Sequence, residues 1–122
     1  MLLAEIVVLL GCTDLLAVEG AGGREIAGCF AADLMSEVLA FSGHAPLLVT
    51  GLTSPQALHT AEVIDAQAIL YVNDKRPDAQ VMALARARGL PLLSTPLTLY
   101  EACGRLHRGG LPASAKRQGT AP

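Results

Sequence analysis

Aromatic residues are scarce in this chain, and tryptophan is absent. Tyr and Phe together make up 3% of the 122 residues. Proteins that bind single-stranded nucleic acid stack the bases on aromatic side chains, so this composition argues against that function. Charged residues are also few, at 16%, whereas hydrophobic residues make up 52%. A disordered chain has the opposite balance, and we expect one folded domain over residues 1–107.

Positive charge is in short supply over most of the chain. Residues 1–107 carry six Lys and Arg against all eleven Asp and Glu, and the other three cations are Arg108, Lys116 and Arg117. A mildly acidic body does not attract phosphate backbones. Together with the shortage of aromatic residues, this predicts that nucleic acid is not a partner.

No cysteine pair has the spacing of a metal site or a redox motif. Cys12, Cys29 and Cys103 are odd in number and lie among apolar neighbours, which favours reduced core thiols over reactive ones. The apolar run at residues 1–11 is too short to cross a bilayer. It also has Glu5 where a signal peptide carries Lys or Arg. These features predict a cytoplasmic protein without a membrane partner.

The stretch from Arg24 to Gly51 carries the clearest pattern in the chain. It predicts a buried strand at 26–30, an apolar helix that begins at Asp33 and ends at Gly43, and a second strand at 47–50. Asp33 has the side chain of a helix cap. The helix has apolar residues along more than one line, which predicts cover on more than one side. These residues are Leu34, Met35, Val38, Leu39 and Phe41.

The alternation of helix and strand continues on both sides of this stretch. Residues 2–10 have helical spacing before Gly11, and residues 15–18 form a short apolar run that fits a strand. Further along, we expect helices that begin at Pro55, at Pro77 and at a Thr98–Glu101 capping box, or one turn earlier at Thr95. Strands are expected at 68–72 and 90–94. Residues 108–122 are rich in Gly, Pro, Ser and Ala, which predicts a disordered tail.

Strands that alternate with helices predict an α/β fold built from repeated βα units. Successive strands are separated by enough chain for a crossover helix, so we expect right-handed units and a mostly parallel sheet flanked by helices. The sheet has four main strands, and residues 15–18 are a candidate fifth strand at one edge.

Recognisable catalytic and metal-binding motifs are missing. The glycines at 20–23 lack the Lys and Ser or Thr of a phosphate loop, and they lead into a strand instead of a helix. No Ser, Cys or Lys has an evident base at a familiar spacing. His59 and Glu62 share a helix face but lack a third ligand. We therefore expect no metal site, no cofactor and no catalytic residue.

Polar and small residues follow the predicted strands at the edge where ligands bind to parallel sheets. Helix N-termini at that edge offer free N–H groups and a partial positive charge, which suit a phosphate or carboxylate. Three of these residues, Asp33, Ser54 and Thr95, have helix capping as an alternative role. The candidate ligand-binding residues are Asp33, Ser36, Thr50, Gly51, Thr53, Ser54, Asn73, Ser94 and Thr95.

Several separated motifs occur in an order that resembles the DRTGG domain family, from about Leu2 to Leu106. The motifs are Arg24-Glu25-Ile26-x-Gly28, Ala32-Asp33-Leu34-Met35-Ser36, Leu48-Val49-Thr50, Leu90-Pro91-Leu92-Leu93-Ser94-Thr95 and Tyr100-Glu101-Ala102-Cys103. The family includes short stand-alone bacterial members and domains of HPr kinase/phosphorylase, phosphotransacetylases and CBS-domain pyrophosphatases. The resemblance implies an accessory regulatory α/β domain, often a homodimer, with no catalytic residues of its own.

The chain departs from the family at the two segments that give it its name. Residues 51–54 read Gly-Leu-Thr-Ser in place of a Gly-Asp-Arg-Thr-like segment, and residues 71–73 read Tyr-Val-Asn in place of Thr-Gly-Gly. A ligand bound by those groups in relatives is therefore not implied here. The motif residues with an expected structural role are Arg24, Glu25, Gly28 and Glu101. Arg24 and Glu25 either pair with each other or hold the start of the first strand.

Three functions follow from these observations. The first is a non-catalytic regulatory domain that binds a nucleotide or phosphorylated metabolite. The second is a dimerisation or docking module for a partner enzyme or signalling protein. The third, suggested by the proteins in which relatives occur, is a small enzyme of acyl or phosphoryl transfer.

Overall fold

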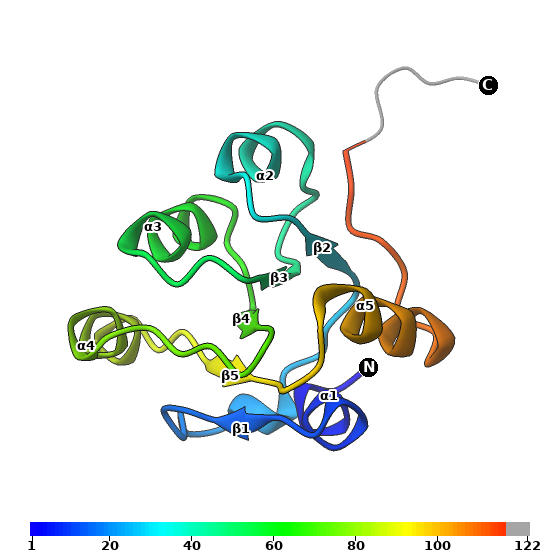
Figure 1. Ribbon diagram of the computed structural model, residues 1–122, viewed down its shortest axis with the longest axis horizontal. Helices are drawn as coiled ribbons and strands as arrows, with labels where there is room; N and C mark the ends of the chain where they lie inside the picture. The colour runs from blue at the N-terminus through cyan, green and yellow to red at the C-terminus, as the bar shows by residue number, and fades with distance from the viewer. Residues whose placement is uncertain (117–122) are drawn as a thin grey trace.

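The computed structural model describes residues 1–116, which form a sheet covered by helices on both faces (Figure 1). The strands are β1 (Thr13–Asp14), β2 (Cys29–Ala31), β3 (Leu47–Thr50), β4 (Ala68–Tyr71) and β5 (Leu92–Ser94). The helices are α1 (Leu3–Leu10), α2 (Met35–Phe41), α3 (Pro55–Val63), α4 (Ala79–Ala87) and α5 (Leu99–Arg108), with a 3-10 turn, η1, at Ala21–Gly23.

The five strands are ordered β1-β5-β4-β3-β2, and every neighbouring pair except β1–β5 is parallel. From β2 to β5 the chain always moves to the adjacent strand in the same direction. Right-handed crossovers of this kind place their helices on one face of the sheet. The expected α/β fold with a mostly parallel sheet is confirmed.

The sheet has a hydrophobic core on each face. On one face α2, α3 and α4 pack against alternate strand residues that include Leu48, Ile69 and Tyr71. On the other face α1 and α5 pack against the intervening residues, which include Val49 and Leu70. All four residues of β3 and of β4 are buried, because helices cover both sides of these strands. In Figure 1 the two helical layers lie on opposite sides of the strands.

Local signals for the helix ends are confirmed at several positions. Helix α1 stops at Gly11, whose φ of 62° is the left-handed conformation that glycine adopts readily. Pro55 is the first residue of α3. Helix α5 begins with the expected capping box, in which the Thr98 hydroxyl accepts from the Glu101 N–H and Glu101 accepts from the Thr98 N–H.

An edge strand is present, but the expectation that it lies at residues 15–18 is wrong. The strand is Thr13–Asp14, which runs antiparallel to β5. The Asp14 carboxylate accepts hydrogen bonds from the Leu16 and Ala17 N–H groups at 3.3 and 3.0 Å, and Ala17 has a φ of 52°. This side-chain turn bends the chain away from the sheet.

Two further elements differ from the expectation. The strand expected at 26–30 begins only at Cys29, because the Ile26 N–H donates to the Met1 carbonyl and so pairs with the N-terminal segment instead. Helix α2 buries only Met35 and Val38. Phe41 is 55% exposed, so this helix is covered on one side and the expectation of wider cover is wrong.

The tail expected to be disordered from residue 108 is ordered as far as Lys116. Arg108 is the last residue of α5, and Leu111 lies in the core with 4% of its surface exposed. Ala113 then bridges to Cys29 and Ala115 bridges to Ser42, so this segment covers the outer edge of β2. The rest of the expected tail, residues 117–122, lies outside the described residues.

Within residues 1–116, no helix is long and apolar enough to cross a membrane.

Candidate functional site

The carboxyl ends of β2, β3, β4 and β5 lie along one edge of the sheet. Parallel pairing sets Thr50 beside Tyr71 and Tyr71 beside Ser94, so the loops that follow these strands leave on the same side. The geometry expected from the sequence is therefore present. The loops after β2, β3 and β4 carry polar groups that contact one another.

Asp33 joins the ends of β2 and β3. Its Oδ1 accepts hydrogen bonds from the Thr50 hydroxyl at 3.0 Å and from the Gly51 N–H at 2.7 Å. The capping role expected for Asp33 is wrong, because α2 begins after Leu34 and has no side-chain cap. Asp33 is exposed, and its second oxygen, Oδ2, accepts no hydrogen bond within residues 1–116.

Lys75 approaches the same glycine from the loop after β4. Its ammonium group donates to the Gly51 carbonyl at 3.3 Å. A Cβ placed on Gly51 would lie 3.5 Å from both the Lys75 Nζ and the Asp33 Oδ1, so both charged groups lie near the position that a side chain would take. We call Asp33, Thr50, Gly51 and Lys75 the Gly51 cluster.

Sequence reasoning missed Lys75 as a site residue. Asn73 and Asp74, which precede it, have φ values of 58° and 57°, and two successive left-handed residues turn the chain back toward β3. Asn and Asp are the non-glycine residues that adopt this conformation most readily, so the Asn73-Asp74 pair was the available signal.

The gap between the ends of β4 and β5 is closed by backbone contacts. The chain leaves β4 toward α4 on one face and leaves β5 toward α5 on the other, an arrangement that opens a crevice in many α/β proteins. Here the Asn73 N–H donates to the Leu97 carbonyl and the Asp74 N–H to the Thr95 carbonyl, each at 2.8 Å. The Ser94 hydroxyl also donates to the Lys75 carbonyl at 2.8 Å. At the Gly51 cluster, by contrast, Asp33 and Lys75 are exposed.

The remaining candidate residues do not join that cluster through side-chain hydrogen bonds within residues 1–116. Thr95 is fully buried, and its hydroxyl donates to the Leu10 carbonyl at 2.6 Å, so it ties α1 to the sheet instead of capping α5. Ser54 precedes α3 without a side-chain cap bond, and its hydroxyl oxygen is buried without a partner in the described chain. Ser36 is exposed and Thr53 half-buried.

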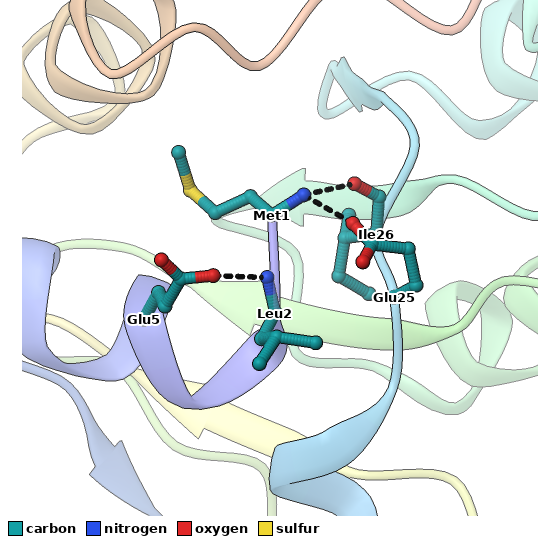
Figure 2. Close-up of polar contacts among 5 residues, drawn as sticks. All are labelled: Met1, Leu2, Glu5, Glu25 and Ile26. Carbon is teal, nitrogen blue, oxygen red and sulfur yellow. Dashed lines mark hydrogen bonds and ion pairs between the residues drawn. The ribbon is translucent and has the colours of Figure 1, made fainter.

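The motif residues Arg24 and Glu25 lie near the start of the strands and do not pair with each other. The Arg24 guanidinium donates to the carbonyls of Gln67 at 3.0 Å and Gly89 at 2.9 Å, which precede β4 and β5. Glu25 forms an ion pair with the Met1 amino group, which also donates to the Ile26 carbonyl at 3.1 Å (Figure 2). These residues hold the N-terminal segment and the starts of the strands together. Of the two roles expected for them, this is the second, to hold the start of the first strand.

Gly28, the last residue of that motif, allows the C-terminal segment to approach. A Cβ at this position would lie 3.0 Å from the Ser114 Cβ and 3.1 Å from the Pro112 carbonyl oxygen. A larger residue would push residues 112–114 away from β2.

The three thiols lack the environment of a reactive cysteine. Burial raises the pKa of Cys12 to about 12. Burial, with a smaller effect of the neighbouring Cys103, raises the pKa of Cys29 to about 11, and burial also raises the pKa of Cys103. The reactive thiolate form is therefore disfavoured at neutral pH. Among residues 1–116, no three His, Cys, Asp or Glu side chains gather in a way that could hold a metal ion.

Comparison with solved structures identifies a close likeness of fold. The chain matches a structure of the CBS and DRTGG domains of the regulatory region of a Clostridium perfringens pyrophosphatase, complexed with the activator diadenosine tetraphosphate. The TM-score is 0.68 at 14% sequence identity, and the match covers 98% of this chain but only 52% of that one. No family model and no curated protein matches the sequence. The fold is DRTGG-like, as the sequence motifs implied.

Proposed function

We propose that this chain is a regulatory domain that binds a phosphorylated small molecule at the Gly51 cluster and catalyses no reaction itself. The observation that carries the proposal is that Asp33 and Lys75 both reach Gly51, at the carboxyl ends of β2 and β3. Both side chains are exposed, so a ligand reaches them from solvent.

The two charged groups favour a ligand that carries both an anion and hydroxyl groups. Lys75 has three N–H donors and uses one on the Gly51 carbonyl, which leaves donors for phosphate oxygens. Asp33 Oδ2 is an acceptor without a hydrogen bond within residues 1–116, and it suits a hydroxyl donor. A nucleotide offers a phosphate and a ribose hydroxyl on one molecule.

The fold supports a nucleotide as the first ligand to test. The pyrophosphatase regulatory region with this fold is complexed with diadenosine tetraphosphate, which activates that protein. Because this chain spans about half of that structure, the position of the activator there is not carried over to it. The fold and the charges of the Gly51 cluster are two separate reasons to try the same class of ligand.

The raised thiol pKa values argue against a transfer enzyme that uses a cysteine nucleophile. Cys12 and Cys29 have pKa values of about 12 and 11, so neither is a good nucleophile at neutral pH. One oxygen of Asp33 accepts hydrogen bonds from the Thr50 hydroxyl and the Gly51 N–H, and these bonds hold the ends of β2 and β3 together. This oxygen therefore has a structural role.

Calorimetric titration tests the proposal. Diadenosine tetraphosphate, ATP and inorganic phosphate are titrated separately into the wild-type chain, and we expect saturable binding of at least one nucleotide. Lys75→Met should weaken that binding by about tenfold or more, because a hydrogen bond to a charged group is worth roughly 1.5–3 kcal/mol. Asp33→Asn should weaken the binding of nucleotides and leave any binding of inorganic phosphate unchanged.

Lys116→Met is the matched control, since Lys116 is an exposed lysine whose N–H donates to the Phe41 carbonyl at the end of α2. It should bind as the wild type does. Binding that Lys75→Met leaves intact would place the site elsewhere, and no saturable heat with any of the three ligands would reject the proposal. Turnover of a phosphorylated substrate that a folded Asp33→Ala variant loses would favour the enzyme instead.

A further inference from the structure

Helix α1 is apolar on its outer side as well as on the side that faces the sheet. Glu5 is the only residue of Leu3–Leu10 that is not apolar. The outer residues include Ala4, which is exposed, and Val8, which is 83% exposed. A helix that is apolar all round is usually covered all round, whereas a surface helix has polar residues on its outer side. The sequence of α1 therefore favours a cover for its outer side.

Two adjoining hollows follow the outer side of α1 and reach the end of α5. The larger has a volume of about 580 Å³, and the residues along it include Val8 and Leu9. The smaller has a volume of about 400 Å³ and is lined by Leu9, Arg105, Arg108 and Gly109. Leu9 and Gly109 line both hollows, and α1 and α5 pack side by side (Figure 1). We call the two hollows together the α1–α5 groove.

The part of the groove on α5 carries positive charge without a bound acid. Neither Arg105 nor Arg108 forms an ion pair within residues 1–116. Glu101, one turn before Arg105, caps the start of α5. Glu5, which lines the larger hollow, accepts from the Leu2 N–H at 2.8 Å and caps α1 (Figure 2). Two unpaired guanidinium groups beside an apolar surface favour an occupant that is apolar and carries carboxylates.

A helix suits this groove better than an extended peptide does. The walls are the outer surfaces of two helices, whose backbone groups bond within each helix and so offer few partners to another backbone. A helix satisfies its own backbone and presents apolar residues along one side. A membrane surface suits the groove less, because binding to anionic lipid typically uses a cluster of about four to eight Lys and Arg.

We propose that the α1–α5 groove docks an acidic amphipathic helix of another protein. The apolar side of that helix covers Val8 and Leu9, and its carboxylates lie against Arg105 and Arg108. The proposal does not depend on ligand binding at the Gly51 cluster, because none of the residues of that cluster lines either hollow.

Selection from a peptide display library tests the proposal on the full chain. The library holds helical peptides of roughly 18 residues, with leucine at every third or fourth position and random residues elsewhere. We expect the wild type to enrich peptides that carry Asp and Glu and few Lys or Arg. Fluorescence anisotropy with an enriched peptide should show binding that Val8→Gln and Arg108→Gln each weaken by about tenfold. Glutamine favours a helix more than valine does, so Val8→Gln should keep the fold.

Val63→Gln and Arg86→Gln are the matched controls. Val63 is 59% exposed on α3, and Arg86 is an exposed arginine in the last turn of α4, so both lie on helices of the opposite layer. Both variants should bind the enriched peptide as the wild type does. Unchanged circular dichroism and melting temperature of all four variants would assign a loss of binding to the groove and not to the fold.

Several outcomes would overturn the proposal. They are a library without enrichment, enrichment without an acidic bias, and binding that Val8→Gln and Arg108→Gln leave intact. Self-association of the wild type that Val8→Gln abolishes would show that the groove holds a second copy of the chain instead. Binding to phosphatidylserine vesicles that Arg108→Gln abolishes would show that it holds a membrane surface.

Discussion

Replacing Leu111 tests whether the segment after α5 is part of the folded core. Leu111 is 4% exposed and belongs to the cluster that contains Ile26 and Leu106. Truncating a buried leucine to alanine leaves a cavity in the core, and such a change lowers the free energy of unfolding by about 2–5 kcal/mol. We expect Leu111→Ala to lower the free energy of unfolding by about 3 kcal/mol.

The change is measured by equilibrium unfolding in urea, together with the melting temperature. A loss of about 3 kcal/mol corresponds to a fall of roughly 10 °C or more in a domain of this size. Val63→Ala is the control, since Val63 is 59% exposed on α3, and it should alter stability by no more than about 0.5 kcal/mol. If Leu111→Ala is as stable as Val63→Ala, then Leu111 is not packed in the core and the tail is disordered, as its composition suggested.

Two other predictions concern the motif residues. Arg24→Lys should destabilise the chain nearly as much as Arg24→Met, because only the guanidinium reaches the carbonyls of Gln67 and Gly89 together. We expect urea unfolding to show a loss of about 1.5–3 kcal/mol in the free energy of unfolding for both variants. A lysine variant as stable as the wild type would contradict this. Hydrogen bonds from the Thr98 N–H and hydroxyl lower the pKa of Glu101, so its contribution to stability is present above the unfolded pKa and lost as the pH falls through the folded one. Glu101→Gln should therefore flatten the acid side of the stability–pH curve, and an unchanged acid limb would refute that role.

The parts of the fold that the sequence predicted well are those set by local patterns. The buried run at 47–50, the proline at the start of α3 and the Thr98–Glu101 box each act within a few residues, and all three are confirmed. The errors arise where a short polar contact overrides an apolar run. Asp14 turns residues 15–18 out of the sheet, although their side chains favour a strand.

The C-terminal segment shows why composition alone was misleading. Its Gly, Pro and Ala content is typical of disorder, but Gly110 has a φ of 97° and the Leu111 N–H donates to the Leu106 carbonyl at 3.0 Å. A left-handed glycine followed by an apolar residue that packs on the last turn is a common helix ending, and this signal was present in the sequence. The close approach of Ser114 to Gly28 and Gly43 was not, because it joins distant parts of the chain.

The candidate site was predicted in outline and not in detail. The alternation of elements was enough to predict parallel strands that end at one edge, and Asp33, Thr50 and Gly51 lie together there. Lys75 joins them through two residues in an uncommon backbone conformation, which a pattern of residue types does not specify. Ligand binding by these residues stays a prediction.

The Gly51 cluster and the start of α5 are joined by a short path of backbone contacts. Asn73 and Asp74, just before Lys75, donate to the carbonyls of Leu97 and Thr95 in the loop that leads into α5. A ligand that changes the position of Lys75 therefore acts on the start of α5 as well.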